Sequence, residues 1–170
     1  MILLPKLISD EIEAMLNKAV LHEYTNGHIY FGMSSYFSKV GFNSAAEVLQ
    51  NWGEEEHTHA TKVKEYIDDR NGKIIIPALD KPLIEFTGMG EILTKVFERE
   101  VDTEKVYNIL SAKALRDNDR PTFEFCTWFI NEQREEIVKA RKLIDSFNLI
   151  GEDNPNMKHF MEEEFKDLLG

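Results

Sequence analysis

Apolar residues recur at steps of three and four along several long stretches of the chain, the period of helices packed against one another. One stripe is formed by Ala45, Leu49, Trp52, Glu56, His59, Val63 and Tyr66. The pattern predicts helices over residues 9–39, 44–70, 90–116, 121–147 and 155–168. A helix of about thirty residues spans about 45 Å. That length suits a long helical bundle better than an ordinary globular core.

The connections between these stretches predict the order in which the helices pack. Residues 40–43 and 117–121 are short, so the helices on either side of each should be antiparallel. Residues 73–89 contain two prolines and three consecutive isoleucines. A connection of that length is expected to carry the chain back to the other end of the bundle. The sequence predicts one all-α domain over residues 1–170, a four-helix bundle with one long crossover and a short fifth helix.

Candidate capping residues lie at several of these boundaries. Ser9 or Asp10 is expected to cap the first helix, and Asn43 or Ser44 the second. Gly72 is well placed to follow the end of the second helix.

Each of the four long apolar stripes is interrupted near its middle by polar residues. They are Glu23, Glu56 with His59, Glu100, and Gln133 with Glu136. A buried carboxylate costs several kcal/mol unless another group compensates it. A Glu-x-x-His pair lies on one helix face, where the two side chains can share a divalent transition metal. One such pair is common on solvated helices. Polar residues at matching depth in all four stripes favour a metal site instead.

Composition narrows the class of protein further. The 42% hydrophobic and 30% charged residues are typical of a soluble globular protein, and no apolar run is long enough for a membrane span. The N-terminus lacks the features of a signal peptide, and the single Cys126 excludes an internal disulfide. We therefore expect a cytoplasmic protein. The net charge of −11 argues against nucleic-acid binding and suits cationic partners.

The central residues also match motifs of a known family. The chain resembles bacterial non-haem ferritins, of the ferritin-like superfamily, over essentially its whole length. The matching pieces are Glu23 seven residues before Tyr30, Glu55-Glu56-x-x-His59, Glu100, and Asn131-Glu132-Gln133-x-Glu135-Glu136. The resemblance implies a ferritin-like fold and a di-iron ferroxidase centre with Tyr30 beside it and Glu56 bridging the irons. Its ligands would be Glu23, Glu56, His59, Glu100, Gln133 and Glu136.

The resemblance has further implications, and the chain departs from related families at several positions. A third iron site is implied, although periodicity alone does not distinguish it from a solvated acidic edge. No haem is expected, because His57 stands where bacterioferritins carry their haem-ligating methionine. Phe123 and Cys126 replace the acidic pair that lines an iron channel in animal ferritins. His22 and His28 lie off the inward phase and are expected at an interface or the surface. The third site would comprise Glu55, Glu132, Glu135 and Glu136.

The function implied by the resemblance is iron storage with ferroxidase activity. Fe(II) would be oxidised by O2, with hydrogen peroxide as a second candidate oxidant, and ferric mineral would be held inside a homo-oligomeric shell of 24 subunits. Two alternatives are a di-iron oxidase or peroxidase without storage and a plain helical interaction module. Apolar residues of the fifth helix are expected to seek a partner surface; they are Met157, Phe160, Met161, Phe165 and Leu168.

Overall fold

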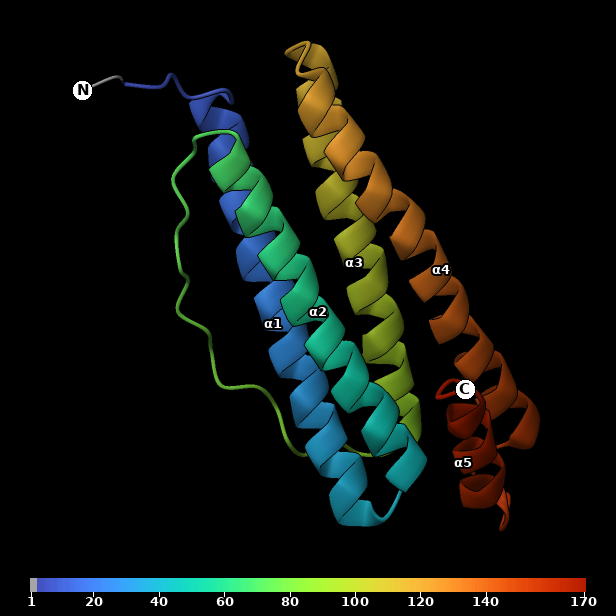
Figure 1. Cartoon of the computed structure of the whole chain (residues 1–170). Helices are drawn as coiled ribbons and strands as arrows, with labels where there is room; N and C mark the ends of the chain where they lie inside the picture. The colour runs from blue at the N-terminus through green and yellow to red at the C-terminus, as the bar shows by residue number, and fades with distance from the viewer. Residues whose placement is uncertain (1–2) are drawn as a thin grey trace.

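The computed structural model describes residues 3–170, and all regular secondary structure in that range is helical. The helices are α1 (Asp10–Val40), α2 (Asn43–Asp69), α3 (Met89–Arg116), α4 (Arg120–Ile150) and α5 (Met157–Asp167). Figure 1 shows α1 and α2 as an antiparallel pair beside α3 and α4, with the segment after α2 running the length of the bundle. The predicted all-α bundle with one crossover and a short fifth helix is confirmed. Within the described range, no helix has both the length and the apolarity that a membrane span requires.

The helix starts only partly follow the local capping signals. Ser9 caps α1 as expected, and its hydroxyl accepts a hydrogen bond from an amide of the first turn at 3.2 Å. The prediction of Asn43 or Ser44 as the cap of α2 was wrong. Phe42 holds the cap position without a side-chain hydrogen bond, and the Ser44 amide donates to Glu162 Oε2 of α5 at 2.8 Å. A distant helix thus supplies the acceptor that the local sequence lacks.

The helix ends depend on residues that tolerate a left-handed backbone. Gly41 and Gly151 follow α1 and α4 with φ of 83°, and the latter allows α4 to continue past the predicted end at residue 147. At the end of α2, Asn71 takes the left-handed conformation instead of Gly72, with φ of 54°. The Gly72 amide then donates to the Ile67 carbonyl at 2.8 Å.

The apolar core consists of two clusters, one toward each end of the bundle. The first surrounds Leu16, Val63 and Phe129, near the start of α1. The second surrounds Phe37 and Leu93, near the junction of α1 and α2. The polar residues predicted at the middle of the four stripes lie between these clusters, so the packing at both ends fixes their depth.

The fifth helix packs against its own subunit. Met161 and Phe165 are buried in the second cluster, and the Phe165 ring lies 6.0 Å from that of Phe37. Phe160 and Leu168 remain exposed. The expectation that all five apolar residues seek a partner is therefore too broad, because two of them complete the core of this chain.

α1 and α2 approach closely at two glycines. A Cβ atom on Gly27 would lie 2.8 Å from the Gly53 carbonyl oxygen and 2.6 Å from His57 Cδ2. His57 consequently packs on α1, with its ring 5.1 Å from that of Tyr24 and 5.3 Å from that of Phe31. Its side chain belongs to the α1–α2 contact and takes no part in the polar middle of the bundle.

Candidate metal centre

Three side chains with metal-binding atoms meet between the two apolar clusters. Glu23 comes from α1, and Glu56 and His59 from successive turns of α2; their donor atoms all lie within 4.8 Å of one another. All three residues are buried. His59 Nδ1 is 3.3 Å from Glu56 Oε2, whereas Glu23 Oε2 has no hydrogen-bond partner among the described residues 3–170. A buried carboxylate oxygen without a partner is rare in native proteins, and a cation would satisfy it.

The other two helices complete the surroundings of this group. Glu100 of α3 accepts hydrogen bonds from the Tyr30 hydroxyl and from Gln133 Nε2 of α4. The Tyr107 hydroxyl donates to the other oxygen of Glu23, Oε1. These contacts orient the carboxylates of α1 and α3 from opposite sides of the bundle. Tyr107 was missed by the sequence reasoning, although its place on the apolar stripe of α3 two turns after Glu100 was a usable signal.

A small cavity lies among the predicted ligands. Its volume of about 10 Å³ is that of one water-sized sphere, so it suits an ion rather than an organic molecule. The cavity is lined by Tyr30, Trp52, Glu55, Glu56, His59, Glu100 and Glu136. Together with Glu23 and Gln133, the structure thus brings all of the predicted di-iron residues into one place.

The electrostatics of the metal-free centre are unfavourable to several ionised carboxylates. Burial is the largest influence on Glu23, Glu56 and Glu100, and it raises the pKa of each above the ordinary value. The negative charges of neighbouring carboxylates also raise these pKa values, whereas hydrogen bonds to Glu56 and Glu100 lower theirs in part. A bound divalent cation would favour the ionised forms and remove this penalty. The residues present therefore fit a metal.

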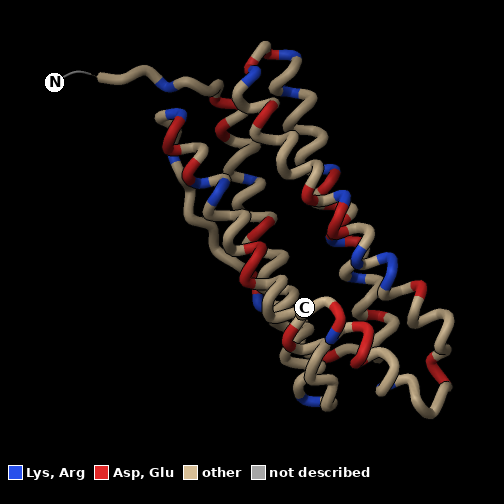
Figure 2. The backbone as a smooth tube through the Cα atoms, turned by 45° about the vertical axis from the view of Figure 1, so that its right-hand side comes forward, with Lys and Arg blue, Asp and Glu red and all other residues tan. Residues whose placement is uncertain are grey.

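A second group of ligating atoms lies on the outer side of the first and shares one residue with it. Glu55, His59 and Glu132 also have donor atoms within 4.8 Å of one another. They line a groove of about 560 Å³ whose wall includes Trp128, with its ring 5.7 Å from that of His59. In Figure 2, acidic residues appear near the middle of both α2 and α4. Of the predicted third-site residues, Glu135 is exposed and joins neither group.

Lys139 lies beside the remaining member of the predicted third site. Its Nζ atom is 2.7 Å from Glu136 Oε1. Burial lowers the pKa of the Lys139 ammonium, but the hydrogen bond to Glu136 and the charges of Glu136, Glu55 and Glu132 outweigh burial and raise it overall. Sequence reasoning missed this contact, for which the three-residue spacing was the only available signal.

His22, predicted at an interface or the surface, is half-buried in a polar cluster between α1 and α3. His22 Nε2 donates to Thr103 Oγ1 at 2.8 Å, and Arg99 Nη2 lies 3.4 Å from the other ring nitrogen. Asn26 Nδ2 donates to Thr103 Oγ1 at 2.9 Å, and Asn26 Oδ1 accepts from Arg99 Nε at 2.8 Å. These four residues are called the Thr103 network below.

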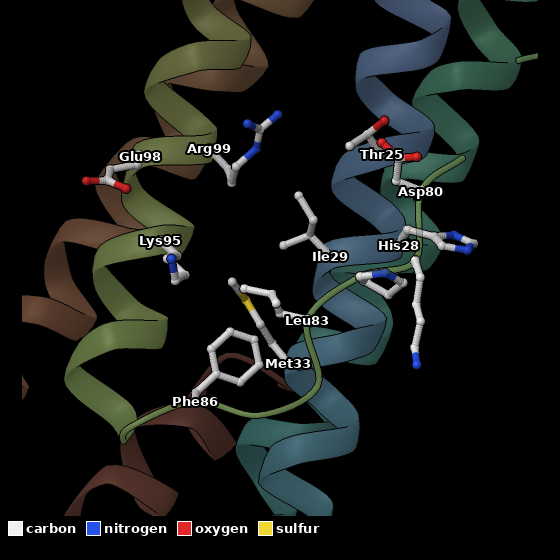
Figure 3. Close-up of a pocket in the computed structure, with 12 residues that line it drawn as sticks. Thr25, His28, Ile29, Met33, Asp80, Leu83, Phe86, Lys95, Glu98 and Arg99 are labelled. Atoms are coloured by element: carbon white, nitrogen blue, oxygen red, sulfur yellow. The ribbon is translucent and has the colours of Figure 1, made fainter. Parts of the chain in front are cut away.

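A further concavity, of about 320 Å³, lies between α1, the crossover and α3, away from the ligating groups. Figure 3 shows Ile29, Leu83 and Phe86 around it, with Lys95 and Arg99 on the α3 side. The polar middle of the bundle, rather than this pocket, gathers the ligating side chains.

Comparison with known proteins identifies the family to which this bundle and its polar centre belong. The family described as Ferritin-like domain matches residues 13–150. The chain therefore belongs to the ferritin-like family.

Comparison with individual proteins is more specific than the match to the family. A bacterial non-heme ferritin of Staphylococcus epidermidis is 33% identical over 148 residues, which cover 86% of this chain and 89% of the relative. A bacterial non-heme ferritin of Escherichia coli O6:H1 is 26% identical over 162 residues, 95% and 98% of the two chains. Among solved structures, an open pore ferritin from Archaeoglobus fulgidus has a TM-score of 0.90 at 27% identity, covering 95% of this chain and 98% of that one. The resemblance to bacterial non-haem ferritins is confirmed.

Proposed function

We propose that this protein is an iron-storage ferritin that oxidises Fe(II) with O2 at the polar centre of its bundle. Membership of the ferritin-like family supports iron storage broadly. The observation that carries the ferroxidase proposal is the buried group of Glu23, Glu56 and His59, in which one carboxylate oxygen has no partner. Iron is the substrate here, and the group offers the hard oxygen donors and the imidazole nitrogen that suit it.

The residues of the centre would divide into two adjacent metal positions. Glu56 contacts His59 and has a donor atom within 4.8 Å of one on Glu23, so it is the candidate to serve both positions. His59 would give one position a nitrogen ligand, while Glu100 and Glu136 line the same cavity and would give the other position oxygen ligands. Two Fe(II) ions held side by side can deliver two electrons to O2 together. Hard carboxylate donors then favour the ferric product.

The residues bonded to these ligands would hold them in place. Gln133 and Tyr30 both donate to Glu100, and Tyr107 donates to Glu23. Such donors fix the orientation of carboxylates before metal arrives, as partners of metal ligands commonly do.

The outer group is proposed as a third iron position. Glu55, His59 and Glu132 support it by their mutual distances, and Glu136 lines the small cavity together with Glu55 and His59. Glu135 has the least support, since it is exposed. A position on the groove side of the centre would give iron a path between the buried group and the surface.

We further propose that the subunits form a closed shell of 24 copies around the mineral. The archaeal ferritin structure covers nearly the whole chain, which supports a comparable subunit shape. The crossover also exposes apolar side chains that a neighbouring subunit would bury, among them Ile75, Ile76 and Leu83.

A di-iron oxidase or peroxidase acting on a separate organic substrate is less well supported. The cavity among the ligands has a volume of only about 10 Å³. An organic substrate needs a pocket of several hundred cubic ångströms, and the space of that size next to His59 is an open groove.

The test is an aerobic Fe(II) titration of the wild-type protein and of Glu56→Ala, followed by light scattering of the iron-bearing species. Wild type should oxidise Fe(II) rapidly and keep hundreds of irons in solution in a particle of several hundred kilodaltons. Glu56→Ala should assemble but lose the rapid phase. Wild-type rates in the variant would rule out this centre, and a monomer or dimer that lets the iron precipitate would rule out storage.

A further inference from the structure

The outer carboxylates already hold a positive charge of the protein itself. Lys139, one turn after Glu136 on α4, places its ammonium 2.7 Å from Glu136 Oε1. The Glu136 side chain is only 11% exposed, so this is the contact of a largely buried carboxylate and not of a solvated pair. Glu136 also lines the small cavity among the predicted ligands.

The charges around Lys139 are unbalanced. Glu136 lines the small cavity together with Glu55, and Glu55 lies within 4.8 Å of Glu132 in the outer group. Three carboxylates thus face one ammonium. Lys62, which lines the groove, places its Nζ over the Trp128 ring instead, 3.9 Å from the ring centre.

An ammonium and a divalent metal ion compete for such a carboxylate. Lysine offers donors only and a single compact charge, so it can occupy the place of a cation but cannot coordinate one. A metal ion bound to Glu136 would lie within a few ångströms of the ammonium, and like charges at that distance repel strongly outside bulk water.

Lys139 is also free to leave. Its side chain is 41% exposed, and its flexible four-carbon stem can turn the ammonium into solvent. Glu136, by contrast, is only 11% exposed and lines the cavity, so its side chain has less room to move. Movement of the lysine, rather than of the carboxylate, is therefore the change that metal binding requires.

We propose that Lys139 is a displaceable counter-cation of the outer metal position: it neutralises Glu136 in the metal-free protein and must swing away when metal binds. Lys139 is a positioning residue, because it acts through Glu136. Its competition weakens the outer position, so that iron passes through it instead of remaining there. The inference rests on the proposed function, since it concerns the metal positions of the same centre.

The test uses Co(II), which is not oxidised in the absence of O2 and whose visible spectrum reports its ligands. Metal-free assembled protein is titrated anaerobically by calorimetry and absorption, and a chelator then measures release. Lys139→Met should tighten the weakest class of Co(II) sites about threefold to tenfold and slow release by a similar factor. Lys139→Arg, which keeps the cation, should restore wild-type binding.

Lys142→Met is the matched control. It removes the same charge from an exposed position on α4 one turn further on, so any general effect of net charge appears there too. Equal binding in Lys139→Met and Lys142→Met would overturn the inference, as would weaker binding in Lys139→Met. If wild type and Glu56→Ala bind Co(II) identically, the proposed centre itself fails, and that result is distinguishable from a failure of Lys139 alone.

Discussion

The Thr103 network and the metal centre both place polar side chains inside an apolar bundle, within one turn of each other on α1 and α3. In the network, Thr103 Oγ1 accepts from His22 and Asn26 and donates to the Arg99 carbonyl at 3.0 Å. The positive charge of Arg99 lies against the Asn26 carbonyl oxygen and a neutral ring nitrogen of His22. Each polar group of the network therefore has a partner supplied by the chain.

The metal centre lacks that balance. Glu23, Glu56 and Glu100 bring three acids into one buried region, and Glu23 Oε2 has no partner. The donors from Tyr30, Tyr107 and Gln133 satisfy part of this demand but contribute no positive charge. The difference shows that burial alone does not indicate a ligand site. What indicates it is a charge that the surrounding residues leave uncompensated.

The largest expected contrast is in the stability of the metal-free protein. Asn26→Ala removes the acceptor of Arg99 Nε and should lower the free energy of unfolding by about 2–4 kcal/mol. Glu23→Gln keeps an acceptor for Tyr107 and removes a buried charge, so it should be neutral or stabilise by about 1 kcal/mol. Denaturant unfolding at pH 7 and fixed protein concentration measures both. Equal losses in the two variants would contradict the distinction between the regions.

The second-largest expected difference between the two regions is the effect of added metal on stability. A cation that binds only the folded protein stabilises it by about 2.7 kcal/mol at a hundred times its dissociation constant. Co(II) under anaerobic conditions should therefore raise the thermal midpoint of wild type and of Asn26→Ala by similar amounts. Glu56→Gln should lose most of this rise. A rise preserved in Glu56→Gln would place the stabilising metal elsewhere.

The two regions should also respond to pH with opposite sign. The folded carboxyls of the metal centre have pKa values above the ordinary 4.5, so above that pH the folded state binds more protons than the unfolded state. Their contribution to stability is therefore lost as pH rises above 4.5. Burial, with the Arg99 charge, lowers the pKa of His22 from 6.5 to about 4. The unfolded state then binds the extra proton, and stability is gained as pH rises from about 4 to 6.5.

The measurement is unfolding of the metal-free protein at several pH values between 4.5 and 7.5. Glu56→Gln should remove part of the loss at higher pH, and His22→Gln should remove the gain below 6.5. Each change should amount to about 1–2 kcal/mol. If the pH dependence of stability in either variant equals that of wild type, the substituted group does not titrate as its surroundings indicate.

The smallest expected effect lies at the edge of the centre. Glu132→Ala removes a donor of the outer group and should alter the number of Fe(II) oxidised per O2 more than the initial rate. Glu135→Ala, at an exposed position, should leave both quantities near those of wild type. Oxygen uptake measured against stopped-flow absorbance tests this. Equal effects of both substitutions would restore Glu135 to the predicted third site.

The periodicity of the sequence was sufficient to predict the helical bundle and the position of its polar centre along the helices. Steps of three and four fix which residues share a helix face, and that relation does not depend on the neighbouring helices. Glu56 and His59 could therefore be assigned to the inward face of α2. The ferritin motifs then connected them with Glu23, Glu100 and Gln133, which the structure gathers at the same place.

Tertiary packing decided what a face alone does not specify, namely which group meets each polar atom. His22 lies off the inward phase, yet it is half-buried because α3 covers that side of α1 with Thr103 and Arg99. Ser44 is capped by Glu162, a residue of α5 far along the chain. Whether a buried polar group is satisfied depends on atoms from other helices, positioned to within a few tenths of an ångström. The repeat of one helix carries no information about those atoms, so the sequence determined where the central carboxylates and His59 lie, and only the assembled bundle determined which polar groups lack a partner.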